Sequence, residues 1–154
     1  MITSWRIVKS KHRARAFDGE GARLAGGRWN SPGVPMIYTA QNAALATLEM
    51  LVHLNTSTVL SSYVLIACAF PEALVLRLDR DRLPARWRAH PAVPQLQLLG
   101  DAWMKNGLSA VLEVPSVIIQ SESNYLFNPA HPDFPSIEVG PAQPFDFDAR
   151  LTKS

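Results

Sequence analysis

A single carboxylate stands out in the first third of the sequence. Glu49 is the only charged residue in the apolar run from Ala43 to Val52. Burying an ionised carboxylate without a partner is costly, so such groups are usually paired, protonated or functional. Two interpretations follow, and the spacing does not separate them. Glu49 either forms a salt bridge or cap with a neighbouring loop, or it is held on a rigid element at the wall of a cleft.

An arginine on a glycine turn precedes this run. Gly26 and Gly27 allow the backbone before Arg28 to turn tightly and to approach a ligand. A guanidinium on such a turn suits bidentate binding of phosphate or carboxylate. The turn is neither a P-loop nor a Rossmann fingerprint, because both motifs are missing from the sequence. Trp29 is expected to pack or stack, and Asn30 to cap the following turn.

Two hydroxyl groups are further candidates. Tyr38 offers a ring for stacking and a hydroxyl for hydrogen bonding, although a tyrosine at such a position is also an ordinary core residue. Ser116, in the stretch VPSVI, lacks the Gly-x-Ser-x-Gly elbow of a hydrolase nucleophile, so it is expected at most to orient a ligand. The four histidines show no metal-ligand spacing, and one cysteine cannot build a zinc site.

Two helices must position these residues. The first is predicted at 42–54, with Asn42 as its N-cap. Its apolar residues surround the helix almost completely, which predicts burial on all sides, with Glu49 in the stripe of Leu45, Leu48 and Val52. The second helix is predicted at 94–106 and ends at Gly107.

The remaining elements are predicted to be strands and loops. Residues 10–34 are expected to form a long loop, and the polar segment 122–134 an irregular one with turn-forming side chains. Strands outnumber helices and do not alternate with them regularly, which favours an α+β fold in one domain over residues 1–154. Strands are predicted at 4–9, 35–40, 61–70, 73–79 and 109–114, with 116–120 extended and a last pair at 136–139 and 145–149.

Composition limits the classes of function. With 154 residues, 47% hydrophobic and 18% charged, the chain fits one globular domain. Cys68 lies in an apolar stretch and is expected to be a buried hydrophobe in a reducing, cytoplasmic setting. No segment resembles a membrane span or a signal peptide.

A net charge of +2 is too small to indicate a nucleic-acid partner. The basic cluster of Lys9, Lys11, Arg13 and Arg15 has two interpretations. It is either a solvated edge, or a contact site for phosphates or an acidic partner.

Taken in order, several stretches resemble the RES-domain family. These are GGRWNSPGVPMIYTA, ALATLEMLVHL, VLEVPSVII and NYLFNPAHPDF, and the resemblance covers about residues 5–139. The family is named for an arginine, a glutamate and a serine, which match Arg28, Glu49 and Ser116. Because several motifs match in order, the resemblance is more specific than any one of them.

The resemblance implies a fold and an activity. RES proteins are toxins of bacterial toxin–antitoxin pairs and are neutralised by an antitoxin with an Xre-like helix-turn-helix domain. Their fold is similar to that of ADP-ribosyltransferase toxins, with a compact α+β core around a split sheet, flanked by helices, where NAD+ binds. Members degrade NAD+ by hydrolysis or phosphorolysis of the nicotinamide–ribose bond, which depletes the cell of NAD+ and arrests growth. Some are reported to ADP-ribosylate a protein.

The resemblance also bears on cofactors and partners. NAD+ is expected as a substrate, with no prosthetic group or metal. Nucleic acid is expected to be reached only through the antitoxin, and a homodimer within that complex stays open. The alternatives are a protein ADP-ribosyltransferase and a non-catalytic nucleotide-binding module, and the sequence does not identify the acceptor.

Roles for individual residues come with the resemblance. Glu49 is expected to stabilise an oxocarbenium-like ribose or to hold a ribose hydroxyl, and Arg28 to neutralise the diphosphate. Ser116 is expected to donate a hydrogen bond from the far wall. The remaining substrate-binding candidates are Tyr38 facing the nicotinamide or its ribose, Arg6 as a second phosphate contact, Tyr63 and Asn124.

Overall fold

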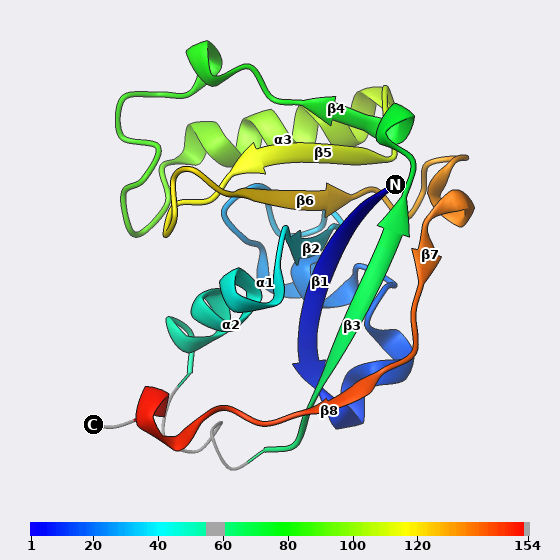
Figure 1. The fold of residues 1–154 in the computed structure, drawn as a ribbon. Helices are drawn as coiled ribbons and strands as arrows, with labels where there is room; N and C mark the ends of the chain where they lie inside the picture. Colours follow the sequence, from blue (N-terminus) through cyan, green and yellow to red (C-terminus); the bar gives the residue numbers. More distant parts are fainter. Residues whose placement is uncertain (55–60, 153–154) are drawn as a thin grey trace.

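The computed structural model describes residues 1–54 and 61–152, and a strongly curled sheet forms the centre of this part of the chain (Figure 1). The strand order is β4-β5-β6-β2-β1-β3-β7, and β8 also pairs with β3. Neighbouring strands are antiparallel except β4 and β5, which are parallel. The strands are β1 (Ile2–Lys9), β2 (Ile37–Ala40), β3 (Tyr63–Phe70), β4 (Val75–Arg77), β5 (Val111–Pro115), β6 (Ser123–Phe127), β7 (Glu138–Val139) and β8 (Gln143–Phe145).

The helices are α1 (Glu20–Ala25), α2 (Ala43–Leu51) and α3 (Pro94–Asn106). Short 3-10 helices occur at Ser10–Arg15, Glu72–Leu74, Arg80–Arg82, Phe134–Ser136 and Ala149–Thr152. The mixture of helices and a largely antiparallel sheet confirms the predicted α+β class. No helix among residues 1–54 and 61–152 is long and apolar enough to cross a membrane.

The sheet consists of two parts that meet at one narrow junction. In Figure 1, β4, β5 and β6 run across the molecule, whereas β1 and β3 run steeply past them. β1 pairs with β3 along all eight of its residues, but with β2 only at Trp5 and Ala40. The junction is reinforced by the Thr39 hydroxyl, which donates to Oγ of Ser4 over 2.7 Å. The expected split of the sheet therefore lies between β2 and β1.

Helices cover one face of the sheet. α2 packs on the junction, where Leu45 and Ala46 join Ile7, Ala40 and Tyr63 in one buried cluster. α3 packs on the β5–β6 side through the cluster of Trp29, Met36, Leu96, Trp103, Leu112, Val114 and Leu126. Both helices therefore pack on the strands that carry the candidate residues Tyr38, in β2, and Asn124, in β6.

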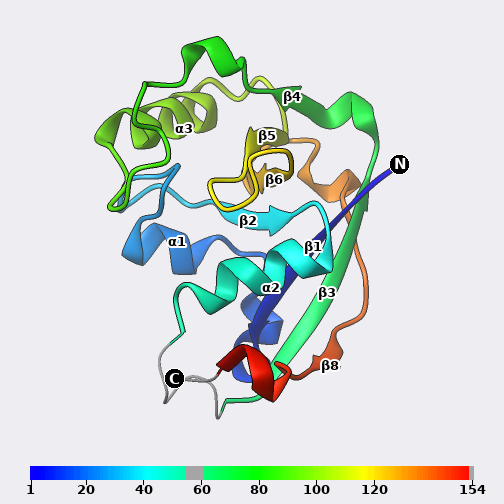
Figure 2. The ribbon, with the colours of Figure 1, turned by 60° about the vertical axis from the view of Figure 1, so that its left-hand side comes forward.

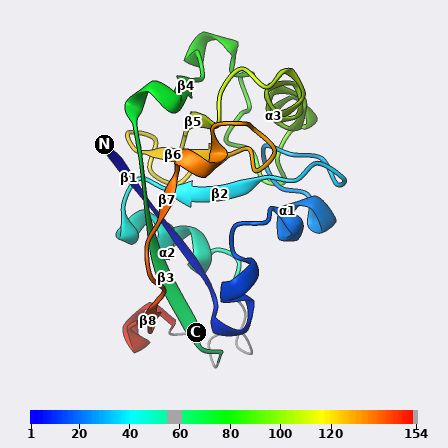
Figure 3. The same cartoon turned by 90° about the vertical axis from the view of Figure 1, so that its right-hand side faces the viewer.

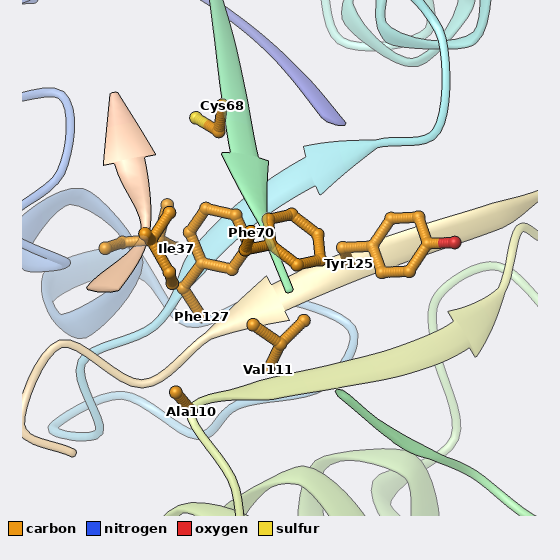
Figure 4. Close-up of a cluster of buried hydrophobic side chains, with 8 residues drawn as sticks. Ile37, Cys68, Phe70, Ala110, Val111, Tyr125 and Phe127 are labelled. Carbon is orange, nitrogen blue, oxygen red and sulfur yellow. The ribbon is translucent and has the colours of Figure 1, made fainter. Parts of the chain in front are cut away.

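The opposite face is an aromatic core. Phe70 makes edge-to-face contacts with Tyr125 and Phe127, with ring centroids 5.5 Å apart in each case (Figure 4). Cys68 belongs to this core and is buried, as predicted. The core ties the β1–β3 part of the sheet to the β5–β6 part.

The predicted signals at helix ends are confirmed. The Asn42 side chain accepts from the backbone N–H of Leu45 at 2.7 Å, so Asn42 is the N-cap of α2. Gly107 takes the left-handed conformation, with φ of 63°, and ends α3 at the predicted residue. The predicted burial of the first helix on all sides is wrong. α2 ends at Leu51, and the side of the helix with Leu48 and Val52 faces solvent, with 37% and 64% exposure.

Other predictions for the chain need correction. Residues 10–34 contain a 3-10 helix and α1, which is only six residues long and so leaves little periodicity to detect. Residues 116–120 form a turn rather than a strand. The segment around Asn124, predicted to be irregular, contains β6, which is central in the sheet.

The predicted last pair of strands also differs from the structure. β7 and β8 each pair with β3 rather than with one another, and both lie along its edge (Figure 3). Apart from Phe145, the second predicted strand lies beyond β8. These residues follow the exposed edge of β3, where pairing is set by that strand and not by a hairpin turn between them.

Candidate functional site

The carboxylate of Glu49 reaches from α2 to the turn and strand that follow β5. Its Oε2 accepts a hydrogen bond from Nδ2 of Asn124 at 2.8 Å, and its Oε1 accepts from the Ser116 hydroxyl at 3.3 Å. Both donors are neutral side chains. The charge of Glu49 is thus held in place by these contacts without being neutralised by them.

Burial dominates the ionisation of this carboxyl group. Desolvation raises the pKa of Glu49 above its usual value, and the hydrogen bonds from Asn124 and Ser116 and the charge of Arg28 oppose the rise without cancelling it. A carboxylate with a raised pKa is a better proton acceptor than an exposed one. Such a group is characteristic of functional sites.

Ser116 organises the turn between β5 and β6. Its fully buried Oγ accepts the backbone N–H groups of Ile118 at 3.1 Å and Ile119 at 3.2 Å, which leaves its own hydrogen for Glu49. Asn124 is fixed in a similar way, since Nδ2 also donates to the Thr39 carbonyl at 3.2 Å. Both donors to Glu49 are therefore tied to the backbone of the sheet region.

Arg28 is the cation that acts electrostatically on Glu49. Its Nη1 donates to the carbonyl oxygens of Trp87 at 3.2 Å and Ala89 at 3.0 Å. Burial lowers the pKa of the Arg28 guanidinium, and the interactions with the nearby Tyr38 phenol and with the charge of Glu49 oppose that shift. Arg28 and Glu49 therefore act on one another electrostatically, although the contacts of Arg28 are to backbone carbonyls.

The loop that carries Arg28 is held firmly. Gly27 and Asn30 form an antiparallel bridge, and Nδ2 of the buried Asn30 donates to the carbonyls of Ala22 at 2.8 Å and Val34 at 3.0 Å. Asn30 thus joins the loop to α1, a larger role than the turn cap expected from the sequence. Trp29 is buried against α3, which fits the expectation that it packs.

Helix α3 supports the same loop from the other side. Asp101 accepts from the Ser31 backbone N–H at 2.9 Å and from its hydroxyl at 2.6 Å. A Cβ at Gly100 would lie 1.6 Å from the carbonyl oxygen of Trp29, so only glycine lets the helix approach this closely. Sequence reasoning missed both α3 residues, although a glycine inside a helix is a signal for a close approach.

The Tyr38 side chain holds the Arg28 loop through two hydrogen bonds. Its hydroxyl donates to Oδ1 of Asn30 at 2.5 Å and accepts the Trp29 backbone N–H at 3.1 Å. Burial is the main reason why the pKa of the Tyr38 phenol is raised, so the phenol stays protonated. The hydroxyl thus stabilises the residues on the C-terminal side of Arg28. The contact of Tyr38 with nicotinamide or ribose stays a prediction.

Arg6 and Tyr63 lie apart from this constellation. The side chain of Arg6 points to the face opposite α2, where its Nε donates to Ala16 O at 2.8 Å and its Nη1 to Tyr38 O at 2.9 Å. Tyr63 is buried under α2 and makes an edge-to-face contact with Phe147, with ring centroids 5.1 Å apart. Substrate contacts of these two residues stay predictions.

A cavity of about 350 Å³ is lined by residues of β4, β5 and β6 and of the segment after β4, among them Arg77, Arg80 and Glu113. Glu49 does not line it. We locate the site by the polar groups that converge on Glu49, because convergent polar groups carry chemistry and size alone does not. Among the described residues, no three His, Cys, Asp or Glu side chains are placed to share a metal ion.

Known proteins of similar sequence match almost the whole chain, including the residues of the site. The family model described as RES domain matches residues 3–148 of the chain. The Prs ADP-ribosylating toxin of Sphingobium sp. (strain YBL2) is 36% identical over 159 residues, with 99% of each chain covered. Toxin Res of Photorhabdus laumondii is 36% identical over 151 residues, with 97% of each chain covered.

Among solved structures, the crystal structure of the M. tuberculosis MbcT–MbcA toxin–antitoxin complex has a similar fold. Its TM-score is 0.73 at 20% sequence identity, and the match covers 94% of this chain and 84% of that one. At this identity the similarity concerns the fold.

Proposed function

This chain belongs to the RES-domain family, and from that premise we propose that it is a toxin enzyme that cleaves the nicotinamide–ribose bond of NAD+. The observation that carries the proposal is the half-buried carboxylate of Glu49, held by Asn124 and Ser116 with no hydrogen bond from a cation of residues 1–54 or 61–152. A negative charge prepared in this way suits a substrate whose reacting group becomes positive.

In the proposed bond cleavage, the negative charge of Glu49 has two uses. When the bond between the ribose C1′ and the pyridinium nitrogen breaks, the electron pair leaves with nicotinamide and positive charge develops on the ribose. Glu49 would stabilise that charge electrostatically. An acceptor oxygen then bonds to C1′ and loses its proton, for which a carboxylate of raised pKa is a suitable acceptor.

Arg28 would bind the diphosphate. Its Nη1 is fixed by two carbonyl oxygens, and this anchoring leaves the rest of the guanidinium to face a ligand. A preorganised guanidinium is well suited to phosphate oxygens. We further propose an antitoxin as partner, supported by the toxin–antitoxin complex whose toxin has a similar fold. We expect that antitoxin to carry an Xre-like helix-turn-helix domain.

Release of nicotinamide from NAD+ by the purified chain tests the proposal. We expect release with ADP-ribose as product if water is the acceptor, and with a phosphorylated ADP-ribose in phosphate buffer if phosphate is. Mass spectrometry of the products in buffers with and without phosphate separates the two acceptors. Absence of nicotinamide release under both conditions, from a protein shown to be folded, would overturn the proposal.

A second candidate function is ADP-ribosylation of a protein. It is favoured by the 36% identity to a relative named as an ADP-ribosylating toxin, over 99% of each chain. Incubating the chain with labelled NAD+ and a bacterial extract would transfer label to a protein in this case. Nicotinamide release that is fast without extract and unchanged by it would favour NAD+ degradation instead.

A further inference from the structure

The segment between β4 and α3 is held to the site by hydrogen bonds from Arg28. In Figure 2 this segment arches over α3 and descends toward the loop between α1 and β2. The carbonyls of Trp87 and Ala89 both accept from Nη1 of Arg28. Arg88 lies between these two residues, so Arg28 fixes the backbone on both sides of it.

The side chain of Arg88 contacts the turn between β5 and β6. Its Nε donates to the carbonyl oxygen of Val117 at 3.1 Å. Val117 follows Ser116, whose hydroxyl donates to Glu49. Arg88 therefore connects the segment fixed by Arg28 with the turn that holds Glu49.

The charge of Arg88 is available to a ligand. The side chain is exposed, and none of the ion pairs in the described part of the chain includes it. Its one described hydrogen bond uses Nε, which leaves both terminal amino groups facing solvent or a ligand. Two guanidinium groups beside one site match the two negative charges of a diphosphate better than one group does.

We infer that Arg88 is a second phosphate-binding residue, which holds the diphosphate of the substrate together with Arg28. This inference rests on the proposed function, because it concerns the same site. Sequence reasoning did not single out Arg88. The available signal was the density of arginine, which occurs five times between residues 77 and 88.

The same segment supplies a matched control. Arg86 is also exposed and carries the same charge two positions away, but none of the described hydrogen bonds connects its side chain to the site. If the positive charge of the segment alone attracted the substrate, Arg86 and Arg88 would contribute equally to the binding affinity. If the hydrogen bond to Val117 instead places the Arg88 guanidinium at the diphosphate, only Arg88 will contribute to the binding affinity.

Equilibrium binding of ADP-ribose, measured by titration calorimetry, separates these cases. We expect Arg88→Ala to raise the Kd about tenfold, as for loss of a hydrogen bond to a charged group, and Arg86→Ala to leave it within about twofold, as for an exposed charge. Arg88→Lys should lie between wild type and Arg88→Ala, because it keeps the charge and loses the planar fork. Thermal unfolding of each variant confirms that it is folded.

The outcomes distinguish the inference from the proposed function. Equal Kd values for the Arg88→Ala and Arg86→Ala variants, whether weakened or not, would overturn the inference while nicotinamide release upholds the function. Failure of the wild type to bind ADP-ribose would also overturn it. The proposed function fails only if nicotinamide release from NAD+ is absent as well.

Discussion

The side-chain amide of Asn124 donates to Oε2 of Glu49 at 2.8 Å, although the two residues are 75 positions apart in the chain. A donor at this position favours the ionised carboxylate, whereas burial favours the protonated form. Burial is the stronger of the two influences, and it raises the pKa of Glu49 above its usual value. The balance between them sets the pH range in which the carboxylate can act.

Removal of the Asn124 amide should shift the pH dependence of activity. In the proposed mechanism Glu49 acts in its ionised form, so kcat/KM for nicotinamide release should rise with pH around a midpoint above the usual glutamate value of about 4.3. Asn124→Ala removes a hydrogen bond to the charged form and should move that midpoint up by about one pH unit. Asn106→Ala, which changes an exposed asparagine at the end of α3, should not move it. A midpoint that stays in place or falls in Asn124→Ala would contradict this assignment.

Neutralising Glu49 should abolish most of the activity. Glu49→Gln keeps the shape of the side chain and removes the charge that, in the proposed mechanism, stabilises the developing positive ribose, so we expect kcat to fall about 100-fold or more. Glu138→Gln changes an exposed glutamate on β7 and should leave the rate unchanged. Steady-state kinetics with NAD+ measures both, and wild-type kcat in Glu49→Gln would exclude Glu49 from catalysis.

The Tyr38 hydroxyl should matter for stability. Tyr38→Phe leaves Oδ1 of Asn30 and the backbone N–H of Trp29 without their partner in a buried environment. We expect the free energy of unfolding to fall by about 1–3 kcal/mol, measured by urea denaturation. The accompanying loss of activity should appear mainly in KM, since the Arg28 loop would loosen. Unchanged stability with a large fall in kcat would instead indicate direct contact with the reacting substrate.

Two helical glycines provide a matched pair. Gly100→Ala would bring a methyl group within 1.6 Å of the Trp29 carbonyl oxygen, so it should force α3 and the Arg28 loop apart and destabilise the fold by more than about 2 kcal/mol. Gly21 in α1 has open space around its Cβ position, and Gly21→Ala should stabilise by about 0.5–1 kcal/mol. Comparison of their Tm values with wild type measures both effects, and a neutral Gly100→Ala would show that the loop yields easily.

Features that depend on a few adjacent residues could be predicted from the sequence. The Asn42 cap and the end of α3 at Gly107 each involve contacts within about one helical turn. The resemblance to the RES-domain family pointed to Glu49 and Ser116, which the structure places in hydrogen-bond contact. Periodicity alone had left Glu49 with two interpretations.

Other features depend on long-range contacts that leave no local pattern. β6 begins with polar residues, and Asn124 is accommodated in a central strand because Glu49 and the Thr39 carbonyl accept its hydrogen bonds. The acceptors of Arg28 are backbone carbonyls at Trp87 and Ala89, and any residue type could supply those. The side of α2 that faces solvent could not be predicted either, because leucine and valine occur there as well as in the core.

The position of β6 in the sheet has a consequence for synthesis of the protein. Glu49 and Arg28 leave the ribosome early, but β6, which lies between β5 and β2, is made from residues 123–127. Until it emerges, β2 and β5 have no strand to join them, and Glu49 lacks both Asn124 and the turn of Ser116. The contacts that hold Glu49 and join β2 to β5 can therefore form only after residues 116–127 have been translated, late in synthesis of the chain.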